Sequence, residues 1–120
     1  VIPLTGPSSV MLALMAAGFN GQNFVFHGYL PVKPQERIKA LRDLEHAVSA
    51  SDQTQIFIET PYRNLAMLES IVKTCNPNLM LCIAADLTLE TEWIRSLSIR
   101  EWKNQKPELH KRPAVFLLGN

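Results

Sequence analysis

The sequence predicts an α/β domain with a mixed sheet of roughly five strands that helices flank. Three observations support this fold class. Apolar residues make up 47% of the chain and charged residues 19%, a composition typical of a packed globular domain. Short apolar runs alternate with segments of helical periodicity. The runs lack a clean alternation of apolar and polar residues, which is typical of strands buried on both faces. The 120 residues correspond to one domain.

The first half of the chain predicts a helix, a strand and a second helix. Residues 6–9 (Gly-Pro-Ser-Ser) are typical of a helix start, because Pro suits the first turn and Ser caps free amides. Residues 9–17 are almost wholly apolar, which indicates a buried helix that ends at Gly18. The aromatic-rich segment 23–30 predicts a strand. Over 34–50 an apolar residue recurs every three to four positions, which predicts an amphipathic helix.

The second half predicts four more strands and two more helices. Thr60 and Pro61 indicate a helix start, with Thr as the cap and Pro at the first helical position. Gly119 is expected to open a turn after the last strand. The expected strands are 54–59, 79–85, 91–97 and 113–118, and the expected helices are 61–73 and a short one at 98–103.

Charge, hydropathy and cysteine content exclude several classes of protein. The net charge of +1 excludes a globally basic nucleic-acid binder and leaves room for a local basic patch. No apolar run reaches the roughly 18 residues of a membrane span, so we expect no membrane partner. Cys75 and Cys82 are too few for a disulfide scaffold and favour a reducing compartment. No cluster has metal-ligand spacing, so we expect no metal. Val1 lies in an apolar run without an initiator Met, which indicates a part excised from a longer protein.

Three segments join a strand end to polar or glycine residues, and ligands gather at the carboxyl ends of strands in α/β sheets. They are residues 5–9 (Thr-Gly-Pro-Ser-Ser), 59–63 (Glu-Thr-Pro-Tyr-Arg) and 113–119. Each also has a purely structural interpretation. Ser8 could cap a helix, Glu59 could pair with Arg63, and Gly119 could turn the chain. Both interpretations remain open at this point.

Four strings in the chain resemble motifs of one known family. They are residues 1–9 (Val-Ile-Pro-Leu-Thr-Gly-Pro-Ser-Ser), 26–31 (Phe-His-Gly-Tyr-Leu-Pro, followed by Lys33, Glu36 and Arg37), 56–63 (Ile-Phe-Ile-Glu-Thr-Pro-Tyr-Arg) and 86–88 (Asp-Leu-Thr). In this order they resemble the C-terminal domain of the tetrapyrrole methylase superfamily, the class III S-adenosylmethionine-dependent methyltransferases. The similarity is greatest to the branch that 2′-O-methylates a cytidine of small-subunit ribosomal RNA.

The resemblance implies a two-domain enzyme with S-adenosylmethionine in the cleft between its domains. Residues 1–120 would form the C-terminal substrate and cofactor half, which we expect to be inactive without the Gly-rich N-terminal domain. The implied cofactor-binding residues are Ser8, Ser9, Glu59, Pro113, Ala114 and Gly119, of which Ser8, Glu59 and Gly119 should line one cavity. The implied substrate-binding residues are Lys33, Arg37 and Arg63. The resemblance further implies a cytoplasmic homodimer that acts on ribosomal RNA.

The chain departs from the branch just after its 79–85 strand. Ala85 and Leu89 stand where the branch has Arg and Lys, which leaves the substrate and the rate open. Asp86, Glu90 and Glu92 form the acidic group nearest a strand end. They are candidates for the proton acceptor that an attacking 2′-hydroxyl requires. A solvated loop is the alternative interpretation of the same residues.

A basic stretch with two tryptophans is a further candidate for RNA binding. Residues 95–112 hold six Lys or Arg against two Glu, and Trp93 and Trp102 lie beside or among them. Cations and a stacking ring are a common way to hold RNA. A charged surface with two anchoring aromatics explains the pattern equally well.

Two other functions remain open. The same fold and cofactor also serve enzymes that methylate a tetrapyrrole or another small molecule. A non-enzymatic binding or dimerisation domain is the third alternative.

Overall fold

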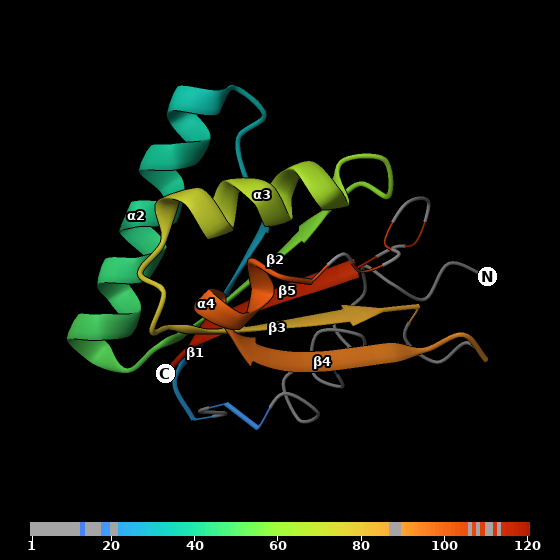
Figure 1. Ribbon diagram of the computed structural model, residues 1–120. Coiled ribbons are helices and arrows are strands. Elements are labelled where there is room, and N and C mark those ends of the chain that lie inside the picture. Colours follow the sequence, from blue (N-terminus) through green and yellow to red (C-terminus); the bar gives the residue numbers. More distant parts are fainter. Residues whose placement is uncertain are drawn as a thin grey trace.

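The computed structural model describes residues 22–86 and 90–105, together with positions 13, 18, 19, 107, 109, 112 and 114–120. These residues form a five-stranded mixed sheet with helices packed on it, which confirms the predicted fold class (Figure 1). The strands are β1 (Phe24–Tyr29), β2 (Thr54–Glu59), β3 (Met80–Ala85), β4 (Trp93–Ser98) and β5 (Ala114–Gly119). The helices are α2 (Pro34–Ser51), α3 (Asn64–Thr74) and α4 (Ile99–Trp102).

The strand directions bring three loops to one edge of the sheet. The strand order is β1-β2-β5-β3-β4. β1 is parallel to β2, and β5 runs antiparallel to both β2 and β3. The carboxyl ends of β1, β2 and β3 therefore lie at the same edge, and β5 begins there. We call this edge, marked by Tyr29, Glu59, Ala85 and Ala114, the carboxyl edge.

The sheet is buried on both faces, which explains the missing alternation in the sequence. All six residues of β2 and all six of β5 are buried. On one face Phe57 and Phe116 stack with ring centroids 5.4 Å apart, in a core that α2, α3 and α4 complete. On the other face residues such as Ile56 and Val115 pack with Ala13 and Phe19. Figure 1 shows α2, α3 and α4 on the same side of the sheet.

Most predicted boundaries are confirmed to within two residues, and one helix start is wrong. The helix expected from residue 61 begins at Asn64, because residues 61–63 form a turn in which the amide of Arg63 donates to the carbonyl of Thr60. Gly119 is the last residue of β5 rather than the start of a turn. The helix expected over 9–17 lies outside the described residues except at Ala13, which is helical and buried.

Among the described residues, no helix combines the length and the apolar character that crossing a bilayer requires.

Candidate functional site

The carboxyl edge brings several of the predicted site residues together. In the register of the sheet, Ala114 pairs with Glu59 on one side and with Ala85 on the other. Asp86 follows Ala85 directly. Glu59 and Asp86 thus flank the first residue of β5, and two strand spacings put their backbones about 10 Å apart. The small side chain of Ala114 lies between two acidic residues at a place where three loops meet.

Glu59 is a buried carboxylate held by two arginines. Its side chain is 2% exposed. One oxygen, Oε1, accepts hydrogen bonds from the amide of Thr60 at 2.7 Å and from Nε of Arg63 at 3.2 Å. The other, Oε2, lies 4.0 Å from Nη2 of Arg37 and has no hydrogen-bond donor within the part of the chain that the structure describes. The pairing of Glu59 with Arg63, one of the two interpretations of the sequence, is present and extends to Arg37.

Arg37 joins the segment after β1 to the end of β2. It is a buried residue of α2, and its guanidinium donates to the carbonyls of Pro31 and Val32 at 3.3 and 3.4 Å. It also donates to the hydroxyl of Ser70 in α3 at 3.4 Å. A buried guanidinium needs several acceptors and a counter-charge, and these contacts supply them. Arg37, expected from the resemblance to bind substrate, therefore fixes the geometry of the edge.

Asp86 takes part in a second polar network rather than in an acidic cluster. Its Oδ2 accepts from Nε of Arg112 and from the hydroxyl of Thr91, both at 2.8 Å. Nη2 of Arg112 also donates to the carbonyl of Thr91 at 2.6 Å. Asp86 itself has a left-handed backbone, with φ of 52°.

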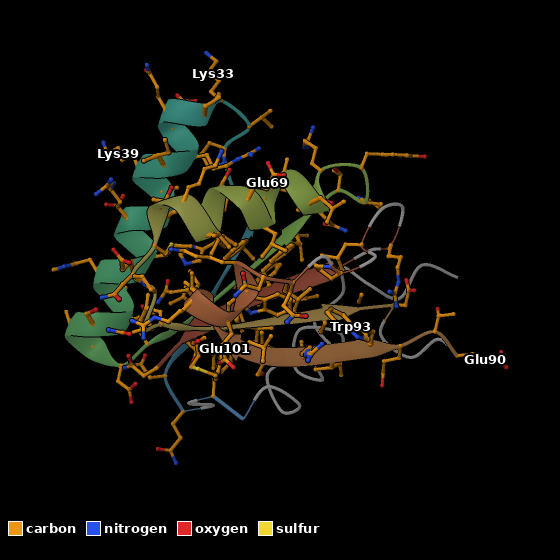
Figure 2. The ribbon with its side chains drawn as sticks, viewed as in Figure 1. Lys33, Lys39, Glu69, Glu90, Trp93 and Glu101 are labelled. Atoms are coloured by element: carbon orange, nitrogen blue, oxygen red, sulfur yellow. The ribbon has the colours of Figure 1, made fainter. Side chains whose placement is uncertain are left out.

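The other two acidic candidates do not join Asp86. Glu90 and Glu92 are exposed, and Figure 2 shows Glu90 pointing away from the body of the molecule. Their exposure agrees with the solvated-loop interpretation, and catalytic roles for Asp86, Glu90 and Glu92 stay predictions. Among the described residues no group of three or more His, Cys, Asp or Glu could hold a metal ion.

Asn64 is a site residue that sequence reasoning missed. It is fully buried at the start of α3, and its Nδ2 donates to the carbonyls of Leu109 and Arg112. Its Oδ1 has no hydrogen-bond partner among the residues that the structure describes. Asn64 thereby ties the segment before β5 to α3 and places Arg112 against Asp86. The only signal in the sequence was its position just after a predicted strand end, which is too common to single it out.

Gly119 lies at the opposite edge from Glu59. Because β5 is antiparallel to β2, Gly119 is five residues from Ala114, about 17 Å along the strand. A Cβ at Gly119 would come 2.9 Å from Cδ2 of Phe19. The absent side chain therefore makes room for the Phe19 ring. The antiparallel pairing of β2 and β5 puts Glu59 and Gly119 at opposite ends of the strand pair, against the expectation that they line one cavity.

The remaining predicted site residues are either exposed to solvent, at least in part, or lie outside the described part of the chain. Lys33 is exposed just before α2, and Figure 2 shows it pointing outward. The Arg63 side chain is 42% exposed, so it contacts both Glu59 and solvent. Ser8, Ser9 and Pro113, expected to bind the cofactor, lie outside the described residues.

The two tryptophans do not both offer a stacking surface. Trp102 is 1% exposed, and its Nε1 donates to the carbonyl of Leu81 at 2.9 Å. Trp93 meets it edge to face, with ring centroids 6.2 Å apart. The interpretation of anchoring aromatics is confirmed for Trp102, which no base can reach. Beside it a cavity of about 420 Å³ lies between α3 and α4, lined mainly by apolar side chains.

Neither cysteine is a reactive thiol. Burial and, to a smaller extent, the nearby carboxylate of Glu45 raise the pKa of Cys75 to about 12. Burial also raises the pKa of Cys82, although a hydrogen bond to Ser96 opposes the shift. A nucleophilic cysteine requires a lowered pKa, so covalent thiol chemistry is excluded at these two residues.

Comparisons with known proteins agree on one group of enzymes. No family model matches the chain. It is 32% identical to "Ribosomal RNA small subunit methyltransferase I" of Escherichia coli O157:H7, over 98% of this chain and 41% of that protein. It is 30% identical to the protein of that name from Buchnera aphidicola subsp. Schizaphis graminum, with the same shares covered. The chain therefore spans about two fifths of the length of these curated relatives.

The fold has solved counterparts as well. The crystal structure of the methyltransferase CobJ matches 92% of this chain, and 47% of its own, with a TM-score of 0.58 and 26% identity. The likeness to these proteins confirms what the four strings of the sequence indicated. This chain is similar over nearly its whole length to a domain of the tetrapyrrole methylase superfamily, and within it to the ribosomal RNA small subunit methyltransferases.

Proposed function

We propose that this chain is the C-terminal half of a two-domain methyltransferase that transfers a methyl group from S-adenosylmethionine to a 2′-hydroxyl of small-subunit ribosomal RNA. One observation carries the proposal, namely the 30–32% identity over 98% of the chain to proteins named ribosomal RNA small subunit methyltransferase I. The covered 41% of those proteins leaves room for the N-terminal domain that the proposal requires.

The carboxyl edge is suited to S-adenosylmethionine. Oε2 of Glu59 and Oδ1 of Asn64 are buried acceptors without a donor among the described residues. A buried acceptor is costly unless a donor reaches it. The ribose hydroxyls and amino groups of the cofactor are such donors. We place Glu59 and Ala114 in the cofactor site, together with Ser8, Ser9 and Pro113.

The residues of this chain would act by binding and orientation. The bound cofactor supplies an activated methyl group on its sulfonium. Arg37 and Arg63 fix the Glu59 carboxylate, so its free oxygen is held in one direction before any ligand arrives. Lys33 and Arg63 would hold the phosphates of the RNA. Orientation of two reactants in this way is a large part of catalysis when one of them is already activated.

A small-molecule acceptor is the second candidate function. The structural likeness to the methyltransferase CobJ favours it, at 26% identity over 92% of this chain. The longer agreement with the ribosomal RNA methyltransferases at higher identity favours RNA. A domain that only binds or dimerises is the third candidate, and it predicts no methyl transfer by the full-length protein.

We also propose that the full-length protein is a cytoplasmic homodimer. β1 is an edge strand of the sheet, and an edge strand offers a surface on which a second copy can add a strand. Sedimentation at micromolar concentration tests this proposal, and a strict monomer would contradict it.

The test of the proposed function is methyl transfer by the full-length protein. Radiolabelled S-adenosylmethionine is supplied with unmodified small-subunit ribosomal RNA or, separately, with a tetrapyrrole acceptor. We expect label in the RNA and its recovery as a 2′-O-methylcytidine after digestion to nucleosides. Label only in the tetrapyrrole would replace the proposal with the second candidate. No label in either would favour the third.

A further inference from the structure

The exposed apolar side chains of this domain are concentrated at one place. Of the six large apolar side chains that are exposed among the described residues, five lie at the last residue of β1, in the loops after β1 and β2, and in the first two turns of α2 and α3; the sixth, Phe26, lies within β1. They are Tyr29, Val32, Ile38, Tyr62 and Leu65, and we call them the aromatic patch. Tyr62 is 71% exposed and Tyr29 56%, although tyrosine rings gain free energy by burial. A clustered exposed surface of this kind indicates a binding site.

The two tyrosines belong to loops that the fold holds at the same edge. Tyr29 pairs in register with Ile58, so the segments after β1 and β2 leave the sheet at the same edge. Glu59 then fixes both segments. Arg37 donates to the carbonyls of Pro31 and Val32 in the segment after β1, and it also forms an ion pair with Glu59. Arg63, in the segment after β2, forms a second ion pair with Glu59. These contacts hold the backbone of the segments that carry the patch in place before a partner binds. Such preorganisation lowers the entropic cost of binding.

Positive charge surrounds the aromatic patch. Lys33 and Lys39 project outward from the start of α2, as Figure 2 shows, and Arg63 adjoins Tyr62 in sequence. Arg37 and Arg63 both pair with Glu59, and the exposed acids nearby are Glu36 in the same turn of α2 and Glu69, one turn after Leu65 in α3. The cations that face solvent here therefore outnumber the acids.

We infer that the aromatic patch binds an unpaired stretch of RNA, with Tyr29 and Tyr62 stacking on bases and Lys33 and Arg63 contacting phosphates. The inference rests on the proposed function and assigns the RNA-binding surface within it. Single-stranded RNA exposes the faces of its bases, and proteins hold these faces with aromatic rings beside cations. The core of a protein interface, in contrast, is depleted of lysine. The combination of two exposed rings with exposed cations therefore favours RNA over a protein partner.

The experiment measures the affinity of the full-length protein for a fluorescent single-stranded RNA oligonucleotide by anisotropy. We expect Tyr29→Ala and Tyr62→Ala each to weaken binding at least about fivefold. Tyr62→Phe, which retains the ring, should stay within about twofold of the wild type. Phe26→Ala is the matched control, because Phe26 is exposed on β1 but lies outside the patch. Lys33→Ala should reduce the slope of log affinity against log salt by about 0.7.

Several results would overturn the inference. They are unchanged RNA affinity in both alanine variants, loss of affinity in Phe26→Ala of the same size, or a wild type that binds no RNA. A change in sedimentation without a change in RNA affinity would assign the patch to a protein interface instead. The methyl-transfer assay is scored separately. A wild type that methylates RNA while the tyrosine variants bind normally contradicts only the inference, and weakened binding without any methyl transfer contradicts only the proposed function.

Discussion

Glu59 shows how one side chain can organise a whole edge of the sheet. It ends a fully buried strand, so its carboxylate has little access to water. Two cations from different elements reach it, and one of them, Arg37, is itself buried. The charge of Glu59 therefore compensates a guanidinium that could not otherwise remain in the protein interior.

The first prediction concerns this compensation. We expect Glu59→Gln to lower the free energy of unfolding by about 3 kcal/mol, because Arg37 would be left as a buried charge without a partner. Arg63→Gln is the control. It removes the other ion pair, but the Arg63 side chain is 42% exposed, so the loss should stay below about 1 kcal/mol. Urea unfolding of the two variants gives the comparison, and equal losses would show that Arg37 does not depend on Glu59.

The second prediction concerns Gly119 and the ring that covers it. We expect Gly119→Val to destabilise the protein by about 1–3 kcal/mol, because added carbons would collide with the Phe19 ring. The same substitution in a Phe19→Ala background should cost clearly less, since the ring is gone. Urea unfolding of the four proteins of this cycle measures the coupling. Folded Gly119→Val should bind S-adenosylhomocysteine with the affinity of the wild type, as a titration measures. A loss of affinity would instead support a place for Gly119 in the cofactor site.

At the scale of elements, the sequence predicts what depends on local pattern and misses what depends on strand direction. The strands β2 and β5 can be predicted from the sequence because their apolar runs are bounded by polar or turn residues. The start of α3 cannot be predicted in this way. Thr60 and Pro61 resemble a helix cap, but the helix begins at Asn64, whose side chain donates to the distant carbonyls of Leu109 and Arg112. Pairing of Glu59 with Arg63 follows from their spacing. The contact with Arg37 requires β1 and β2 to be neighbours, which no spacing reveals.

The third prediction concerns the short helix α4. Ser98 and Glu101 form a reciprocal cap, in which Oε1 of Glu101 accepts from the amide and the hydroxyl of Ser98 at 3.1 and 2.9 Å. The hydrogen bond from the Ser98 backbone, and then that from its side chain, lowers the pKa of Glu101. We expect Ser98→Ala to raise this pKa toward its ordinary value, and Arg95→Gln, which removes a smaller cause, to raise it less. Carboxyl NMR titration measures both.

The sign of the accompanying pH dependence follows from the lowered pKa. The cap stabilises the folded protein at pH values above the pKa that Glu101 has in the unfolded chain. This contribution is lost as the pH falls through the lower pKa of the folded state. Stability in that acidic window should therefore depend less on pH in Ser98→Ala than in the wild type. An identical pH dependence in the two proteins would contradict the assignment of the shift to the cap.

At the scale of the whole molecule, different parts of the mixed sheet provide the stability of the domain and its candidate binding surfaces. Its central strands are covered on both faces and hold the domain together. Its carboxyl edge carries buried polar groups with unused acceptors and an exposed aromatic patch. Two buried acceptors without donors among the described residues are a cost for an isolated domain, and a ligand or a second domain that supplies donors would remove that cost. This arrangement agrees with the proposal that the chain forms one half of a site.

The last prediction follows from this half-site. We expect residues 1–120 alone to give no methyl transfer with labelled S-adenosylmethionine and ribosomal RNA, while the full-length protein does. Orientation of both reactants requires contacts from both sides of the cleft, and losing one side loses the geometry as well as affinity. Binding of S-adenosylhomocysteine by the fragment should be severely weakened for the same reason. Circular dichroism first establishes that the fragment is folded. Turnover by a folded fragment would contradict the prediction, because every group needed for the reaction would then lie within these residues.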